Sequence, residues 1–348
     1  MLDDLNAVKS LDTRDLLGMT AHMPEHLIEG FQLGRSAAPD GLEIGRIAVC
    51  GLGGSAIGGD LLCAWLSGVS EIPCGVYRSY SIPNHIGRDS LVLAVSYSGN
   101  TEETLSMAKQ ALDRGSGMIA VSSGGQLKDI AAERDIPHCS LPSGLVPRSA
   151  IGYMLGCLTG VLDGAGIVKG RADIDDSADV LGRVLSDCGP EIGTDRNPAK
   201  RLAHELHGTV PVVIGHDASI PVARRWASQF NENAKMVAFS DELPEMNHNG
   251  IVGWISDTLS RGFSMIILEQ DQRDSRMSKR IEATKAMVSE RMQVFSSSAV
   301  GESPLGRMLS QVMVGDYVSL YSAFLRGVDP STTEPIDELK RIMTNERI

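Results

Sequence analysis

The sequence predicts an α/β fold with two tandem domains, each containing a mostly parallel sheet flanked by helices. Short apolar, β-branched runs alternate with segments of helical periodicity, a pattern typical of parallel strands joined by crossover helices. The second half of the chain repeats the order of the first, which indicates two copies of one α/β unit. In such sheets ligands bind at the carboxyl ends of the strands, so the functional residues are expected there.

The predicted elements divide the chain into three parts. Residues 1–40 form an N-terminal helical segment, residues 41–168 the first domain, and residues 169–348 the second domain with a C-terminal tail. Apolar runs predict strands at residues 46–50, 74–78, 91–96, 118–122 and 138–141, and again at residues 210–214, 236–239, 264–268 and 292–296. The charged residues 169–187 predict a solvated helix between the halves, and Ile336, Leu339 and Ile342 predict a docked tail.

The composition of the chain restricts its partners and its location. The formal net charge is −12, which argues against a nucleic-acid partner because such a partner needs a basic face. The polar, acidic N-terminus does not resemble a signal peptide. The longest apolar stretch, residues 151–168, contains Asp163 and five glycines, which favours packed helices over a membrane span. We therefore expect a cytoplasmic protein with no membrane partner.

The cysteines do not follow a pattern typical of metal sites or disulfide frameworks. No CxxC pair occurs, and most of the cysteines lie among apolar residues. This distribution predicts buried free thiols in a reducing compartment. The six cysteines are at positions 50, 63, 74, 139, 157 and 188.

Residues 91–104, with the sequence LVLAVSYSGNTEET, predict a strand, a tight turn and a helix start. Ser96, Ser98 and Thr101 place three hydroxyl groups at the start of the helix, and Gly99 permits a close approach of the backbone to a ligand. A helix N-terminus with unpaired N–H donors suits a phosphate group. The alternative is an ordinary helix cap, but three hydroxyls within six residues exceed what capping needs.

The matching turn in the second half has the opposite electrostatic character. Glu269, Asp271 and Asp274 follow the equivalent strand and would repel a phosphate group. We therefore expect one phosphate site per chain, in the first half.

A glycine-rich turn at residues 51–59 follows the first predicted strand. Its glycines lack the spacing of a dinucleotide-binding motif, and no acidic residue ends the second strand. We expect Gly53, Gly54 and Ser55 to line a sugar-phosphate pocket beside Ser96.

Three further residues are candidates for catalysis, each with a structural alternative. Arg148 precedes an apolar helix, where it is either a surface charge or a group that stabilises negative charge on a substrate oxygen. Glu232, between two asparagines at the end of a helix, is either a general base with a pKa raised by partial burial or a locally bonded carboxylate. His248 lies in a polar loop and is the best candidate for proton transfer among the histidines. His204 and His207 have near-helical spacing but no third ligand, so no metal site is expected.

With these motifs the chain resembles the bifunctional phosphoglucose/phosphomannose isomerases. They belong to the sugar isomerase (SIS) fold superfamily and contain two such domains. The resemblance covers nearly the whole chain and rests on GLGGSAIGGD, SYSGNTEET, PRSAIGYMLG, NENAK, ELPEMNHNGIVGW and the tail GVDP…IDELK, all in order. It implies aldose–ketose isomerisation between glucose 6-phosphate, or mannose 6-phosphate, and fructose 6-phosphate. The reaction passes through a cis-enediolate and needs no metal or nucleotide cofactor.

The resemblance also implies roles for individual residues. Ser55, Ser96, Ser98 and Thr101 would hold the phosphate group of the substrate. Arg148 would stabilise the enediolate, and Glu232 would move the proton between C1 and C2. His248 would open the sugar ring from the partner subunit of a homodimer, with Lys340 assisting from the tail.

In the tail, the family has a threonine that makes room for either epimer at C2. Thr333 is our choice for this role, although Ser331 and Thr332 compete for it, and the family pattern does not include the following Glu334. This departure leaves the mannose activity less firmly implied than the glucose activity. The alternative to an isomerase is a non-catalytic sugar-phosphate-binding regulatory protein, which would need a helix-turn-helix module and a basic face that the sequence lacks.

Overall fold

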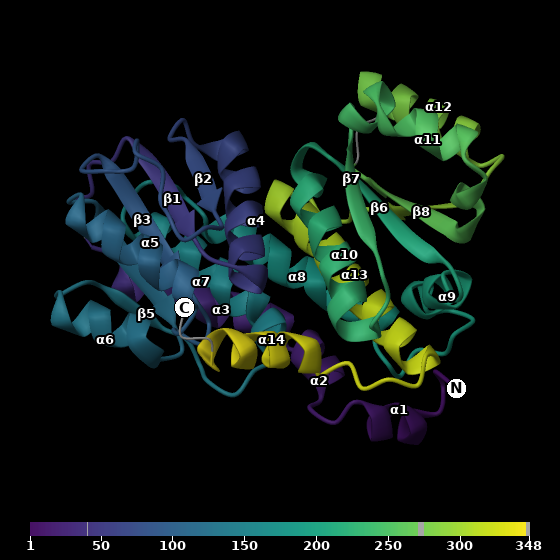
Figure 1. Cartoon of the computed structure of the whole chain (residues 1–348), viewed down its shortest axis with the longest axis horizontal. Helices are drawn as coiled ribbons and strands as arrows, with labels where there is room; N and C mark the ends of the chain where they lie inside the picture. Colours follow the sequence, from purple (N-terminus) through teal and green to yellow (C-terminus); the bar gives the residue numbers. More distant parts are fainter. Residues whose placement is uncertain (40, 271–274, 346–348) are drawn as a thin grey trace.

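The computed structural model describes residues 1–39, 41–270 and 275–345 of the chain. Two α/β halves lie side by side, each built around its own sheet (Figure 1). The first sheet has the strand order β2-β1-β3-β4-β5 and the second has the order β7-β6-β8-β9. Within the described residues, every pair of neighbouring strands is parallel. The predicted fold class is therefore confirmed.

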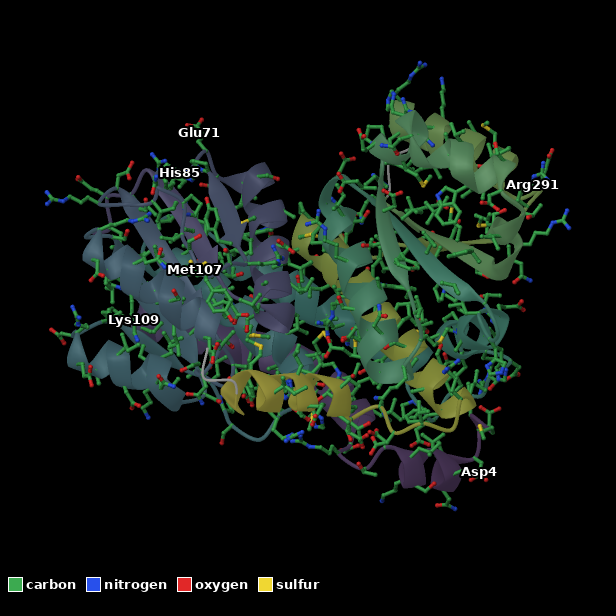
Figure 2. The ribbon with its side chains drawn as sticks, viewed as in Figure 1. Asp4, Glu71, His85, Met107, Lys109 and Arg291 are labelled. Atoms are coloured by element: carbon green, nitrogen blue, oxygen red, sulfur yellow. A yellow bond between two sulfur atoms is a disulfide. The ribbon has the colours of Figure 1, made fainter. Side chains whose placement is uncertain are left out.

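The first half follows the predicted alternation of strands and helices. Its inner strands consist almost entirely of aliphatic residues because helices cover both faces of the sheet; β3, for example, is buried along its whole length. On α5, Met107 lies inside the half and Lys109 points outward, as expected of an amphipathic helix (Figure 2). The elements are β1 (Arg46–Cys50), α4 (Gly53–Val69), β2 (Cys74–Tyr77), β3 (Ser90–Val95), α5 (Glu102–Asp113), β4 (Gly117–Ser122), α6 (Gly125–Glu133), β5 (His138–Ser140), η1 (Pro147–Ala150) and α7 (Ile151–Gly164).

The N-terminal segment contains α1 (Leu5–Leu11), α2 (Leu16–Ala21) and α3 (Met23–Ala37), and α3 packs closely along α7. Glycines on both helices allow this contact: a Cβ at Gly34 would overlap the carbonyl oxygen of Cys157, and one at Gly156 would overlap that of Leu27. The apolar residues 151–164 thus form a packed helix, as predicted. In the part of the chain that is described, no helix combines the length and apolar character that a membrane span requires.

The second half repeats the plan, with one strand and one helix differing from prediction. The predicted strand at 236–239 is wrong in position: β7 begins at Phe239, because α10 ends in a left-handed residue, Lys235, and the chain then needs several residues to reach the sheet. The helix predicted to be solvated, α8, buries one face against α13. The elements are α8 (Arg171–Cys188), α9 (Pro198–Glu205), β6 (Val210–His216), η2 (Asp217–Ser219), α10 (Ile220–Ala234), β7 (Phe239–Leu243), η3 (Glu245–His248), α11 (Gly250–Ser256), η4 (Thr258–Gly262), β8 (Phe263–Glu269), α12 (Arg276–Val288), β9 (Gln293–Ser298) and α13 (Pro304–Leu325).

The tail ends in α14 (Glu334–Asn345), which is less docked than the sequence predicted. Ile336, Leu339 and Ile342 are 43%, 58% and 43% exposed, so the prediction of a docked apolar face is wrong. The contacts that hold the tail involve residues 329–332 instead, which we call the strap. The domain boundaries at 40/41 and 168/169 stay predictions, and residues 40 and 346–348 lie outside the described part.

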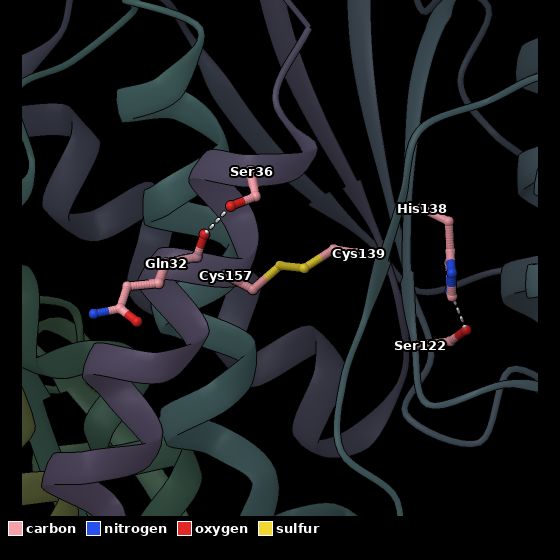
Figure 3. The surroundings of a disulfide bond; sticks show 6 residues. All are labelled: Gln32, Ser36, Ser122, His138, Cys139 and Cys157. Carbon is pink, nitrogen blue, oxygen red and sulfur yellow. Dashed lines mark hydrogen bonds between the residues drawn. A yellow bond between two sulfur atoms is a disulfide. The ribbon is translucent and has the colours of Figure 1, made fainter.

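Two disulfides correct the expectation of free thiols. Cys63 on α4 is bonded to Cys74 on β2, and Cys139 on β5 is bonded to Cys157 on α7 (Figure 3). The members of the two pairs are 11 and 18 residues apart and lie on a helix and a strand, so they meet through tertiary packing, which sequence spacing does not reveal. Cys50 and Cys188 are the buried free thiols.

Candidate active site

The first sheet reverses its strand order between β1 and β3, which creates a crevice at the carboxyl ends of these two strands. The turn after β1 and the turn after β3 meet there: a Cβ at Gly51 would lie 3.0 Å from the carbonyl oxygen of Val95. The two glycine- and hydroxyl-rich turns predicted to bind phosphate are therefore neighbours in space.

Two helices begin at this crevice without side-chain caps. The N-cap residues are Leu52 for α4 and Thr101 for α5, and neither side chain bonds the first turn of its helix. The Thr101 hydroxyl instead forms a hydrogen bond of 2.8 Å with the hydroxyl of Ser96, which is almost fully buried. The first-turn N–H groups of both helices thus lack side-chain acceptors, an arrangement suited to a dianion.

The glycines and the remaining hydroxyls shape the same crevice. Gly99 has φ +70° and packs against the carbonyl of Gly124, whereas Gly53 has φ +52° with open space around it. Ser55 is buried at the start of α4, and its hydroxyl contacts the sulfur of Met154 at 3.5 Å. Ser98 is exposed at the rim.

Arg148 connects the turns after β1 and β3, which were predicted to bind phosphate, to the second half. A Cβ on Gly54 would lie 3.4 Å from the Cα of Arg148, which is only 5% exposed. Its Nε donates to Asn233 Oδ1 at 2.6 Å, its Nη2 donates to the Pro330 carbonyl, and its Nη1 lies 3.6 Å from Glu232 Oε2. The alternative of a surface charge is therefore wrong. Burial lowers the pKa of this guanidinium and the charge of Glu232 opposes that effect, but the group stays protonated because its ordinary pKa is so high.

Glu232 lies in the last turn of α10, and its side chain is 32% exposed. Because α10 runs antiparallel to the strands, Glu232 is at the amino edge of the second sheet, facing the carboxyl edge of the first. Lys235 Nζ donates to the Glu232 carbonyl at 2.9 Å and satisfies part of the helix C-terminus. Sequence reasoning missed Lys235, although it belongs to the NENAK motif.

The strap crosses the site and is bonded by three parts of the chain. Thr13 donates to Asp329 Oδ2 at 2.6 Å, and Arg148 and Lys235 both donate to the Pro330 carbonyl. Lys235 also donates to the Thr332 carbonyl at 2.9 Å. These bonds fix the tail where it passes the pair of Arg148 and Glu232.

The tail hydroxyls differ in their bonding. Ser331 and Thr332 use their hydroxyls in bonds to Thr13 and to the Asp329 carbonyl, at 3.2 and 3.4 Å. The hydroxyl of Thr333, which is half-buried, makes no hydrogen bond to any described residue. Of the three, it is therefore the hydroxyl that would give up no hydrogen bond to a described residue on binding a ligand.

His248 is not brought to Glu232 within one chain. His248 is exposed at the end of η3, after the carboxyl end of β7, whereas Glu232 precedes the amino end of that strand. A five-residue strand spans about 16 Å. Lys340 is exposed on α14, and Figure 1 shows α11, which follows His248, and α14 on opposite sides of the molecule.

No metal site was expected, and within the described ranges no three His, Cys, Asp or Glu side chains form a group able to hold a metal ion. Arg148 and Glu232 are the two charged side chains paired at the candidate site. A cation beside a carboxylate, next to an anion-binding crevice, can stabilise an oxyanion and move a proton on a phosphorylated substrate.

Comparison with known families defines the class of protein. The SIS domain family matches residues 42–139, and the bacterial phospho-glucose isomerase C-terminal SIS domain family matches residues 195–343. A hypothetical protein from Thermus thermophilus shares the fold with a TM-score of 0.76 and 16% identity, over 99% of this chain and 94% of that one. Tagatose-6-phosphate ketose/aldose isomerase from Escherichia coli shares it with a TM-score of 0.72 and 15% identity, over 92% and 96%. The chain is thus a protein with two SIS domains.

Curated relatives narrow this class. The bifunctional phosphoglucose/phosphomannose isomerase of Caldicellulosiruptor bescii is 36% identical over 328 residues, covering 92% of this chain and 96% of that protein. The Aquifex aeolicus protein of the same name is 33% identical, over 84% and 89%. D-glucosamine-6-phosphate 4-epimerase from Sulfolobus acidocaldarius is 34% identical, over 68% and 73%. The chain belongs to the bifunctional phosphoglucose/phosphomannose isomerase family.

Proposed function

We propose that the protein interconverts glucose 6-phosphate and mannose 6-phosphate with fructose 6-phosphate, without a metal or other cofactor. The observation that carries this proposal is the distance of 3.6 Å between Arg148 Nη1 and Glu232 Oε2, beside two uncapped helix N-termini at the switch point of the first sheet. Such a constellation suits a phosphorylated aldose whose C2 proton is weakly acidic. The names of the relatives agree with this reaction.

In the proposed mechanism the substrate phosphate binds the backbone N–H groups at Gly53 and Gly54 and the hydroxyls around them. These hydroxyls belong to Ser55, Ser96, Ser98 and Thr101. The carboxylate of Glu232 removes the proton from C2 of the open-chain aldose, and the electron pair forms the C1–C2 double bond of the enediolate. Arg148 stabilises the negative charge on the enediolate oxygen. The O2 hydroxyl proton then passes to O1, and Glu232 returns its own proton to C1 as the C2–O bond becomes the carbonyl of the ketose.

The same intermediate accounts for both aldoses. C2 is planar in the enediol, so a proton delivered to either face of C2 gives glucose 6-phosphate or mannose 6-phosphate. We propose that Thr333 lines this part of the site, supported by its free hydroxyl next to the strap.

We also propose that the protein is a cytoplasmic homodimer in which His248 of one subunit opens the ring in the site of the other. The position of His248 beyond the far end of β7 from Glu232 supports this arrangement. Lys340, which is exposed on the α14 helix that follows the strap, would assist ring opening.

The substitution Glu232→Gln tests the proposal. It keeps the size of the side chain and removes its basicity, so kcat should fall by about 10³-fold or more while KM changes little. The assay follows glucose 6-phosphate formation from fructose 6-phosphate with purified protein and excess chelator. Turnover within about tenfold of wild type would exclude Glu232 as the base.

The assay also separates the rival functions. A regulatory protein would bind sugar phosphate without turnover, and nothing in the comparisons supports that alternative. A 4-epimerase would convert glucosamine 6-phosphate and leave fructose 6-phosphate unchanged. Parallel rates with glucose 6-phosphate and mannose 6-phosphate give the epimer preference.

A further inference from the structure

We infer that Asn233 is a positioning residue that orients the Arg148 guanidinium, acting within a buried ring of hydrogen bonds that joins the two halves of the protein. The inference rests on the isomerase function proposed above. The ring consists of Arg148 before α7, Arg225 and Asn233 on α10, and Asp316 and Ser319 on α13.

The bonds of the ring form a closed path. Arg148 Nε donates to Asn233 Oδ1 at 2.6 Å, and Asn233 Nδ2 donates to Ser319 Oγ at 2.9 Å. Ser319 Oγ donates to the Asp316 carbonyl at 2.8 Å. Arg225 donates to both carboxylate oxygens of Asp316 at 2.9 and 2.7 Å. Its Nη2 also donates to the Arg148 carbonyl at 3.0 Å, which closes the path. The guanidinium and the backbone of Arg148 are thereby held by the same network.

Each bond in the ring has a direction that the chemistry fixes. The Nε of Arg148 can only donate, so the amide of Asn233 must present its oxygen there and its nitrogen to Ser319. The hydroxyl hydrogen of Ser319 is used on the Asp316 carbonyl, so this hydroxyl accepts from Asn233. All five residues are at most 5% exposed. A satisfied network at such low exposure is rigid, because any rotation leaves a buried donor without an acceptor.

The two buried arginines of the ring have different partners. Asp316 neutralises Arg225 through two hydrogen bonds. Arg148 instead donates from Nε to a neutral amide oxygen and from Nη2 to a carbonyl oxygen. Glu232 is the acidic group nearest its Nη1, at 3.6 Å. Arg148 therefore keeps its positive charge for an oxyanion. Because Asn233 directly follows Glu232 on α10, one helix turn carries the base and fixes the cation opposite it.

The substitution Asn233→Leu tests the inference against a matched control, Gln229→Met. Gln229 lies one turn earlier on α10, is 4% exposed and donates to Asp316 Oδ1 at 2.9 Å, but forms no hydrogen bond with Arg148 among the described residues. Both changes remove one buried amide, so both should lower the melting temperature. Only Asn233→Leu should lower kcat, by about 10- to 100-fold, with KM within about threefold of wild type. Equal kcat values for the two variants, or an effect on KM alone, would overturn the inference.

A second variant, Asn233→Asp, gives a readout that needs no catalysis. The introduced carboxylate would pair with Arg148 at hydrogen-bond distance, and this charge-assisted bond should outweigh the opposing effect of burial, so its pKa in the folded state should lie below the ordinary value near 3.9. The variant should then lose stability relative to wild type as the pH falls below about 4, and keep it above that pH. If wild type fails to isomerise sugar phosphates, the proposed function fails, and this titration still decides whether Arg148 bonds position 233. A pH dependence equal to that of wild type would contradict the ring.

Discussion

The switch points of the two sheets have the same topology and different chemistry. Cys50 pairs with Ala94 in the first sheet as Ile214 pairs with Ile267 in the second, so Ser96 and Glu269 occupy equivalent positions at the strand ends. The hydroxyl of Ser96 faces the uncapped N-terminus of α5. The carboxylate of Glu269 is bonded by Lys285 instead.

The helices that follow these strands also differ in whether their N-terminal N–H groups have acceptors. α12 is capped by Ser275, which accepts the Ser278 N–H at 3.0 Å, whereas α5 has no side-chain cap. α4 begins with Gly53, whereas α10 begins with Ile220 and then Pro221, whose nitrogen carries no hydrogen. The proposed anion site thus lies where helix donors have no side-chain acceptors, whereas the second half caps such donors or lacks them. Asp271 and Asp274, which we also expected to repel phosphate, lie outside the described residues.

The largest expected effect on activity comes from adding a methyl group at Gly99, in the turn at the first switch point. In Gly99→Ala the new Cβ would overlap the Gly124 carbonyl, so the turn carrying Ser96 and Ser98 must move. A displacement of this size should lower kcat/KM by about 10²-fold or more. The control Gly208→Ala has the same left-handed backbone with no atom within 4 Å, so it should cost about 1–2 kcal/mol of stability and leave activity unchanged. Equal activities of the two variants would place the phosphate elsewhere.

A smaller effect on activity is expected from removing the hydroxyl of a serine at each switch point in turn. Ser96→Ala should raise KM for the sugar phosphate about tenfold, because one hydrogen bond to a charged group is lost, and should also lower the free energy of unfolding by about 1 kcal/mol, because the bond to Thr101 is lost. Ser275→Ala should leave KM unchanged and lower the free energy of unfolding by about 1 kcal/mol through the lost cap. Steady-state kinetics and urea denaturation measure both quantities. The comparison of the two switch points fails if Ser275→Ala raises KM as strongly as Ser96→Ala.

The smallest effect concerns the pH dependence of stability at the second switch point. Burial raises the pKa of Glu269, but hydrogen bonds from Lys285 and Ser296 and the Lys285 charge outweigh burial and lower it. A lowered pKa gives stability that is present above the ordinary value near 4.3 and lost as the pH falls below it. Glu269→Gln should remove this loss, worth about 1 kcal/mol or less for a partly exposed pair. Urea denaturation at about pH 6 and about pH 3.5 measures it, and an unchanged difference between the two pH values would contradict the assignment.

The sequence was sufficient to predict the elements that depend on local pattern. The strands of the first sheet appear where apolar runs predicted them, because buried parallel strands need continuous aliphatic residues. The proximity of the turns after β1 and β3 was predictable because adjacent parallel strands bring their carboxyl ends to one edge. The start of β7 was not, because the apolar residues 236–238 lie in the connection, whereas the strand itself contains Ser240, Asp241 and Glu242.

Contacts between distant segments were beyond sequence reasoning. Cys139 and Cys157 meet through packing of α7 near β5, and no spacing rule indicates this pair. The partners of Arg148 come from α10 and from the strap, so only the folded chain distinguishes a buried cation from a surface charge. The NENAK motif drew attention to Glu232. The contacts of Asn233 with Arg148 and of Lys235 with the strap could not be assigned from the motif alone.

The glycine contacts between α3 and α7 determine how the protein can be divided experimentally. A fragment beginning at residue 41 would contain the first sheet but lack α3, and would leave the groove on α7 formed by Gly152, Gly156 and Gly160 open to water. Apolar side chains on both sides of that groove would then promote aggregation of the fragment. The smallest fragment that keeps the turns after β1 and β3 folded should therefore begin before Met23. This start precedes the boundary at 40/41 that the sequence predicts.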